Sequence, residues 1–334
     1  MKIEKHGSKY RVRKMYKGKV YIVDFDYEPD DMDVFIAIGR EMEKNGVSAK
    51  GSFSYFAKKY IENRKNVVSP NTVRTYNTKL KQLSRNFKDK NINDIQSEDV
   101  QAEINRLSTK LEPKTVKTTY GFITAVLGAN RSLGGIKVKL PQTIKKDVYE
   151  PTNEDIKRIL KEVEGTEYSV AFQLGVWGCR QGEIAALTIE DLDENNNLHI
   201  HRTMVMDENN KWLIKETPKT DESNRIIPLP KELADEIREQ GFIYNKVPNR
   251  LNKKIHDVQK KLGIPPFKFH TLRSYFASFA HSLGIPDSDI LSLGGWATDS
   301  VMKRVYRKSI EESKAKSVER FAKRLYSSQK SAKG

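Results

Sequence analysis

The chain has 334 residues and carries 60 Lys and Arg against 44 Asp and Glu, a formal net charge of +16 at pH 7. This length allows two or three domains, and the positive charge favours nucleic acid as the partner, bound in a salt-sensitive manner. We expect no membrane span and no signal peptide, because no apolar run is long enough and the N-terminus alternates basic and apolar residues. The single Cys179 cannot form an internal disulfide, which is typical of a reducing cytosol.

The first 47 residues predict a small β-sheet with a helix behind it. Alternation over residues 8–16 predicts a strand, and a second strand is expected over Lys19–Phe25. Three basic side chains share one face of the first strand: Lys9, Arg11 and Arg13. Pro29 and the acidic residues that follow it predict a helix that ends at Gly46. Such a sheet could read a DNA groove with its cationic face, and a solvated basic ribbon is the alternative.

Residues from about 50 to 133 predict a helical domain. Ser69 and Pro70 open a helix with a long apolar stripe, and a second long helix is expected over residues 113–129. The stripe consists of Val73, Tyr76, Leu80, Leu83 and Phe87. Both helices carry Lys and Arg on the opposite side. Residues 134–150 form a basic linker, and Thr152 is expected to cap the first helix after it.

Three short strands are expected over residues 198–202, 211–215 and 225–228. The last connection between them contains Lys219, while Lys215 ends the second strand. His199 and His201 share one face of the first strand, yet no third ligand joins them, so the pattern does not favour a metal site.

Two arginines and a nearby histidine suit chemistry on a phosphodiester. Arg180 lies in the run Gly178–Glu183, and His270 precedes Arg273 by three residues, which on a helix puts both side chains on nearly the same face. Guanidinium groups bind phosphate oxygens through paired, charge-assisted hydrogen bonds. Each preorganised donor of this kind typically contributes about 3 kcal/mol to lowering the barrier. Glu183, one turn from Arg180, is expected to orient that arginine.

The segment after this box adds an indole donor, Trp296, and a phenol, Tyr306. A phenol with a pKa near 10 is ionised to only about one part in a thousand at pH 7, so it needs a base or a cation nearby to act as a nucleophile. His270 is a candidate for this base. Each residue taken alone has a structural alternative, a surface ion pair for an arginine or a packing role for Trp296 and Tyr306, and their joint occurrence in this order favours function.

The Arg180 motif, the His-x-x-Arg box and the terminal tyrosine resemble the tyrosine recombinase (phage integrase) family, over about residues 150 to 325. The resemblance implies that Tyr306 attacks DNA to give a 3′-phosphotyrosyl link without metal or other cofactor. It implies phosphate binding by Arg180 and Arg273, and it places Trp296 where relatives carry His or Trp. Lys219 matches the lysine that acts as general acid, with Lys215 as the alternative.

The resemblance also implies a multidomain, mainly α-helical fold with small β-sheets. The expected layout is an arm-type DNA-binding domain over residues 1–47, a helical core-binding, SAM-like domain over 50–133, a basic linker over 134–150 and a catalytic domain with a helical tail over 151–334. Two departures stand out: Thr271 replaces the Asp of many relatives, and the spacing from Trp296 to Tyr306 is one residue longer than in familiar members. An extra helical residue rotates a side chain by about 100°.

The implied function is integration, with or without excision, of a phage or mobile element in the cytoplasm of a bacterial host, in association with the nucleoid. The implied partners are double-stranded DNA at core and arm attachment sites and three further copies in a homotetramer, with a host DNA-bending protein and a directionality factor as candidate accessory partners. Docking of the tail on its own protomer or on a neighbour stays open. The alternatives are a non-catalytic DNA-binding regulator and a type IB topoisomerase-like enzyme.

Overall fold

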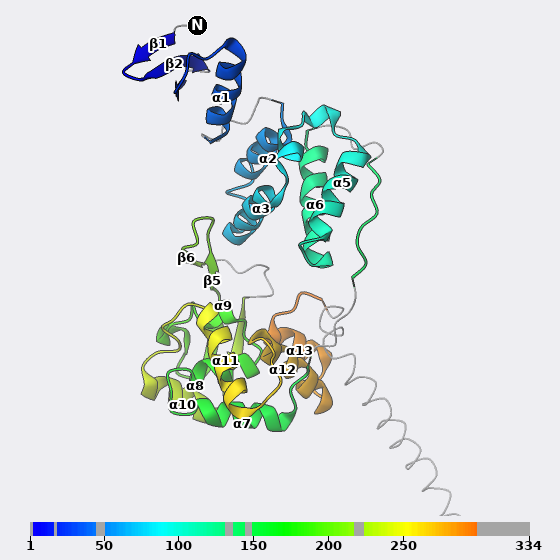
Figure 1. Cartoon of the computed structure of the whole chain (residues 1–334). Helices are drawn as coiled ribbons and strands as arrows, with labels where there is room; N and C mark the ends of the chain where they lie inside the picture. The colour runs from blue at the N-terminus through cyan, green and yellow to red at the C-terminus, as the bar shows by residue number, and fades with distance from the viewer. Residues whose placement is uncertain are drawn as a thin grey trace, which may run out of the picture. The chain divides into compact units, whose positions relative to one another are not determined.

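The computed structural model describes residues 3–16, 19–44, 51–130, 136–143, 149–216 and 224–298 (Figure 1). The chain divides into two compact units, one within residues 1–68 and 75–144 and the other within residues 69–74 and 145–334. The described residues are mainly helical, with three small antiparallel sheets. The predicted fold class is therefore confirmed. No helix of the described ranges combines the length and the apolar character that a membrane span requires.

The N-terminal part of the first unit is a three-stranded sheet covered by one helix. Strands β1 (Ile3–His6), β2 (Lys9–Tyr16) and β3 (Lys19–Phe25) pair in that order, and α1 spans Asp31–Lys44. The Asp30 carboxylate accepts a hydrogen bond from the Asp33 amide at 2.7 Å and so caps the helix. Strand β1 was not predicted. The small core between sheet and helix consists of Val12, Tyr21, Val34 and Ile38.

The outer face of this sheet differs from the predicted cationic face. Arg11 forms a bidentate ion pair with Asp24 across β2 and β3, at 2.7 and 2.8 Å, and Lys9 lies 3.2 Å from Asp26. These carboxylates belong to β3 and to the residue after it. The predicted cationic face was based on the residues of β2 alone and did not take them into account. The face is therefore mixed in charge.

The helices of the first unit form a bundle around an apolar core. They are α2 (Phe53–Glu62), α3 (Pro70–Gln82, from residue 75 onward), α4 (Arg85–Asp89), the 3-10 helix η1 (Ile92–Asp94), α5 (Ser97–Ser108) and α6 (Pro113–Gly128). The apolar stripe predicted for one helix runs over two, because Ser84 caps α4 by accepting a hydrogen bond from the Phe87 amide at 3.2 Å. Leu83 and Phe87 are still buried. The prediction that these residues face the core is therefore confirmed, whereas the predicted extent of the helix is wrong.

Part of the predicted linker lies along α5. The side chain of Gln101 accepts a hydrogen bond from the Lys139 amide at 2.7 Å and donates one to the Lys139 carbonyl at 3.1 Å. The Lys137 amide donates to the Ser97 hydroxyl at 3.0 Å. Residues 136–143 therefore belong to the surface of the first unit.

The second unit packs helices around one short two-stranded sheet, and a second two-stranded sheet extends from them as a hairpin (Figure 1). Its helices are α7 (Asn153–Val163), α8 (Ser169–Val176), α9 (Gln181–Ile184), the 3-10 helix η2 (Ile189–Asp191), α10 (Lys231–Gln240), α11 (Asn249–Leu262), α12 (His270–Ser282) and α13 (Asp287–Gly294). Thr152 caps α7 as predicted, since its hydroxyl accepts a hydrogen bond from the Asp155 amide at 3.1 Å.

Four strands are present here among the described residues, where three were predicted. Strand β4 (Asn197–Ile200) pairs with β7 (Arg225–Pro228), and β5 (Thr203–Met206) pairs with β6 (Trp212–Lys215), both antiparallel. Strand β5 was missed because β4 and β5 follow each other closely and the sequence run looks like a single strand. The β5–β6 hairpin therefore lies in the sequence between β4 and β7, the two strands of the other sheet.

Candidate active site

The two predicted phosphate-binding arginines meet at the C-terminal end of α13. Arg180 precedes α9, and its Nη2 atom donates to the Gly295 carbonyl at 2.7 Å. Arg273, one turn into α12, donates through Nη1 to the carbonyls of Gly178 and Gly294 and through Nη2 to that of Gly295 at 3.4 Å. Both guanidinium groups thus share the Gly295 carbonyl, although their residues are far apart in the sequence.

The end of α13 is suited to hold positive charge. The last carbonyls of a helix have no partner within it, and the helix dipole places partial negative charge there. Gly295 ends the helix in the left-handed conformation with φ +64°. The carbonyls of Leu293, Gly294 and Gly295 accept hydrogen bonds from Arg225, Arg273 and Arg180, respectively.

Glu183 is buried between two of these arginines. Its Oε1 atom accepts from Arg180 Nη1 at 2.5 Å, and its Oε2 atom accepts from the Arg180 amide and from Arg225 Nη2, both at 2.9 Å. Burial alone would raise the pKa of Glu183, but the charge and hydrogen bond of Arg225, followed by Arg180, lower it below its usual value. Glu183 is therefore ionised at neutral pH, in the orienting position predicted for it.

Arg273 is enclosed by protein, and only 2% of its surface is exposed. Its guanidinium carbon lies 3.9 Å from the ring centroid of Trp296, a cation–π contact, and the indole stacks in parallel with Phe276 at 6.4 Å. Burial lowers the pKa of Arg273 to about 9, and the charge of Arg180 acts in the same direction. The group stays charged at neutral pH, and the indole of Trp296 lies against it.

His270 is the first residue of α12 and lies one turn before Arg273. Loss of hydration, followed by the positive charges of Arg273 and Arg180, lowers the pKa of its imidazole below the ordinary value. The side chain still reaches solvent. A neutral, accessible imidazole beside two guanidinium groups can accept a proton at neutral pH.

Two glycines let these groups come close together. A Cβ atom on Gly294 would overlap the indole of Trp296. Gly178, at φ +87°, would bring a Cβ atom to 2.9 Å from the ring of Phe276. The arginine site therefore depends on glycine at both positions.

The predicted nucleophile Tyr306 and general acid Lys219 lie outside the described residues. The alternative general acid, Lys215, ends β6. Cys179, beside Arg180, is buried, and burial raises the pKa of its thiol to about 11. A thiol with this pKa is protonated at neutral pH, so Cys179 has a packing role.

Two histidines, one in β4 and one just after it, are each paired with a carboxylate. His199 Nε2 lies 3.3 Å from Asp193 and His201 Nε2 lies 2.8 Å from Asp191. Within the described ranges no group of three or more potential ligands could hold a metal ion.

Sequence reasoning missed Arg225. It pairs with buried Glu183 and donates to the Leu293 carbonyl at 2.7 Å. One signal was available, because the alternation of β7 puts Arg225 on the same face as the buried Ile227, and a charge on a buried face needs a partner.

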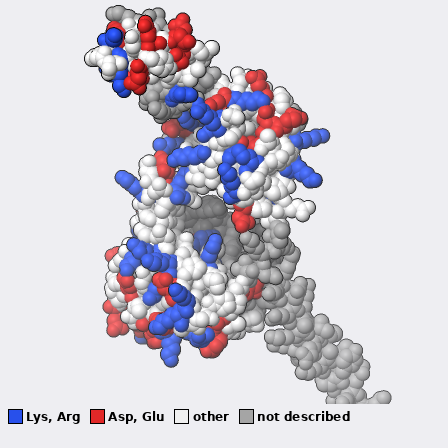
Figure 2. All heavy atoms as spheres, viewed as in Figure 1, with Lys and Arg blue, Asp and Glu red and all other residues white. Residues whose placement is uncertain are grey.

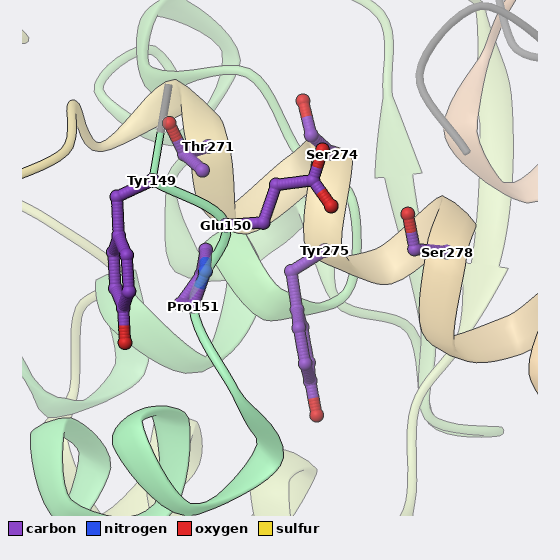
Figure 3. Close-up of a pocket in the computed structure, with 7 residues that line it drawn as sticks. All are labelled: Tyr149, Glu150, Pro151, Thr271, Ser274, Tyr275 and Ser278. Carbon is purple, nitrogen blue, oxygen red and sulfur yellow. The ribbon is translucent and has the colours of Figure 1, made fainter. Parts of the chain in front are cut away.

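A separate pocket lies on another face of α12 (Figure 3). The figure shows residues 149–151 on one side and hydroxyl-bearing residues of α12 on the other. Its lining consists of Tyr149, Glu150, Pro151, Thr271, Ser274, Tyr275 and Ser278. Neither of the paired arginines lines this pocket, so the arginine site and the pocket are distinct.

Comparisons with known proteins identify a matching domain and a relative in sequence. Residues 52–108 match the family described as phage integrase, N-terminal SAM-like domain. A protein named tyrosine recombinase XerC-like, from Caldanaerobacter subterraneus subsp. tengcongensis, is 25% identical over an alignment that covers 67% of this chain and 70% of that protein.

Two solved structures share the fold. The Tn1549 transposon integrase in complex with transposon right end DNA matches with a TM-score of 0.67 at 18% identity, covering 81% of this chain and 99% of that one. A lambda integrase tetramer bound to a Holliday junction matches with a TM-score of 0.58 at 17% identity, covering 89% and 92%. The fold is thus that of the integrases. Within this fold, residues 52–108 match the SAM-like domain of phage integrases, and the chain is similar in sequence to a protein named tyrosine recombinase XerC-like.

Proposed function

We propose that this protein is a site-specific DNA recombinase that cuts and rejoins DNA through a 3′-phosphotyrosyl intermediate. The observation that supports this most directly is the meeting of Arg180 and Arg273 at the Gly295 carbonyl, beside a neutral histidine and an indole. Two guanidinium groups held by preorganised acceptors match the charge that develops on the non-bridging oxygens of a phosphorane.

The proposed reaction begins with attack of the Tyr306 oxygen on the DNA phosphorus. His270 accepts the phenolic proton, the bond from phosphorus to the 5′-oxygen breaks, and Lys219 donates a proton to that oxygen. Arg180, Arg273 and Trp296 bind the phosphorane. A 5′-hydroxyl of the partner strand then attacks the phosphotyrosine and releases Tyr306, so the number of phosphodiester bonds is conserved and no cofactor is consumed.

The charge of the surface supports a DNA partner. Figure 2 shows Lys and Arg side chains spread over the helices of the first unit and over one side of the second. In the bundle of the first unit, Lys81, Lys114 and Lys117 are exposed. We propose that residues 50–133 bind the core site, that residues 1–47 bind arm sites, and that residues 134–150 connect them to the catalytic domain over residues 151–334.

We also propose that four copies act together on DNA, by analogy with the lambda integrase tetramer bound to a Holliday junction. The biological reaction would be integration, or integration and excision, of a phage or other mobile element, in the cytoplasm of a bacterial host near the nucleoid. A DNA-bending protein of the host and a directionality factor are the proposed accessory partners.

The test is covalent capture of DNA. Protein purified under denaturing conditions from cells that carry the DNA flanking its gene should retain fragments whose 3′ ends map to one site. A nicked suicide duplex built on that site should then trap an adduct with the wild type and none with Tyr306→Phe. The hydroxyl alone differs between these side chains, so folding and DNA binding serve as matched controls.

Other outcomes identify the alternatives. An adduct that persists in Tyr306→Phe would move the nucleophile to another residue. DNA binding without any adduct would indicate a non-catalytic regulator. Relaxation of supercoiled DNA by a monomer, without strand exchange between two sites, would indicate a topoisomerase.

A further inference from the structure

We propose that Arg225 is a positioning residue that holds Arg180, through Glu183, in the geometry needed to bind the scissile phosphate. This inference rests on the proposed function. The side chains of Arg225 and Glu183 are each only 4% exposed, and they lie 2.9 Å apart. A charged pair at this depth needs a structural or functional reason, because removing two charges from water costs free energy that their attraction must offset.

The pair controls both the backbone and the side chain of Arg180. Glu183 Oε2, the atom that accepts from Arg225, also accepts from the Arg180 amide at 2.9 Å. Its other oxygen accepts from Arg180 Nη1 at 2.5 Å. A shift of the carboxylate therefore moves Arg180 at two points.

Arg225 reaches the same site by a second route. Its Nε atom donates to the Leu293 carbonyl at 2.7 Å, directly before the Gly294 and Gly295 carbonyls that hold Arg273 and Arg180. One side chain on β7 thus contacts both the carboxylate that orients Arg180 and the helix end that both phosphate-binding arginines share.

Only an arginine can make both contacts at this position. The guanidinium presents Nε and Nη2 in a fixed fork, whereas the ammonium of a lysine is a single point charge. Arg225→Lys therefore keeps the charge that Glu183 needs and loses the simultaneous contact with Leu293. This makes it a sharper test than removal of the charge.

The experiment measures single-turnover adduct formation on the suicide duplex together with affinity for the same DNA. We expect Arg225→Lys to slow adduct formation by about 10- to 100-fold, as a misplaced catalytic group does, with affinity changed less than about twofold. Arg202→Lys is the matched control. Arg202 also pairs with a mostly buried carboxylate, Asp191, at 2.7 Å, but its hydrogen bonds within the described ranges go to neither Arg180 nor α13.

A double-mutant cycle separates positioning from a general structural role. If Arg225 acts through Arg180, Arg225→Lys should slow adduct formation by less than about twofold in an Arg180→Lys background. An equal loss in both backgrounds, an unchanged rate, or a rate that falls only with DNA affinity would overturn the inference. If circular dichroism shows Arg225→Lys to be unfolded, Glu183→Gln replaces it in the cycle. Failure of the wild type to form any adduct would instead overturn the proposed function.

Discussion

At the scale of single residues, the protonation of His270 links the structure to a measurable property. The imidazole lies at the start of α12, where it is partly removed from water and near the positive charges of Arg273 and Arg180. These surroundings lower its pKa. The neutral imidazole, which can accept a proton, therefore predominates down to a lower pH than in an ordinary histidine.

We therefore expect the rate of adduct formation to fall with decreasing pH only below about pH 6.5, the ordinary pKa of histidine. The sign follows from the lowered pKa: the base is neutral above it and becomes protonated as the pH falls through it. His270→Asn should remove this limb and lower the plateau by about 10² to 10⁴-fold. Single-turnover rates over a pH series provide the measurement.

The exposed His256 of α11 offers the control, and His256→Asn should keep both the limb and the plateau. An acid limb that persists in His270→Asn would assign it to another group. A limb well above pH 6.5 would contradict the lowered pKa.

At the scale of secondary structure, the approach of α9 to β5 positions Arg180. A Cβ atom on Gly182 would lie 2.7 Å from the Thr203 hydroxyl and 2.8 Å from the Met204 carbonyl. A backbone carbonyl in a paired strand cannot move aside as a flexible side chain can. Glycine at this position therefore sets the distance between the helix that follows Arg180 and the β5–β6 hairpin.

Gly182→Ala should lower the free energy of unfolding by about 1 to 3 kcal/mol, the usual cost of overpacking. Gly121→Ala, in the middle of α6, should raise it by about 0.5 to 1 kcal/mol, because nothing beyond its own helix lies within 4 Å of the place its methyl group would take and alanine favours a helix. Urea unfolding of both variants measures the difference. Equal effects of the two substitutions would contradict the close approach.

Elements with local signals could be predicted from the sequence. Thr152 and Asp155 form a capping box that marks the start of α7, and alternating residues marked β3 with its observed bounds. Strand β1 could not be predicted, because all four of its side chains are exposed and only pairing with β2 makes it a strand. The break at Ser84 was hidden because the apolar stripe continues through it.

The same distinction applies to the candidate site. Arg180, His270 and Arg273 were predictable because each stands in a short motif, and the structure brings all three together. Arg225 has no motif, since its partners are a carboxylate on α9 and a backbone carbonyl at the end of α13. The alternation of β7 puts Arg225 on the buried face, but it does not identify these remote partners.

At the scale of the whole molecule, net charge determines how the protein responds to salt. A formal charge of +16 and exposed lysines on the first unit should release many counterions from a DNA duplex. Arg11 and Lys9 of the N-terminal sheet should contribute little to this release of counterions, because both are already paired with carboxylates.

We expect affinity for a duplex of arbitrary sequence to fall by about 10³-fold or more between 50 and 200 mM salt, as it does for proteins that contact several phosphates. Fluorescence anisotropy at a series of salt concentrations measures the slope. A peptide nucleic acid duplex, which has no phosphates, is the control and should not bind. Affinity that is independent of salt would rule out phosphate contacts as its main source.

The contact between Gly294 and Trp296 also constrains how this protein can diverge. Any side chain at position 294 would occupy the space of the indole, so that position cannot change while Trp296 keeps its place on Arg273. Descendants of this sequence can acquire a larger residue there only together with a smaller or reoriented one at 296. The two positions are thus expected to be inherited as a pair.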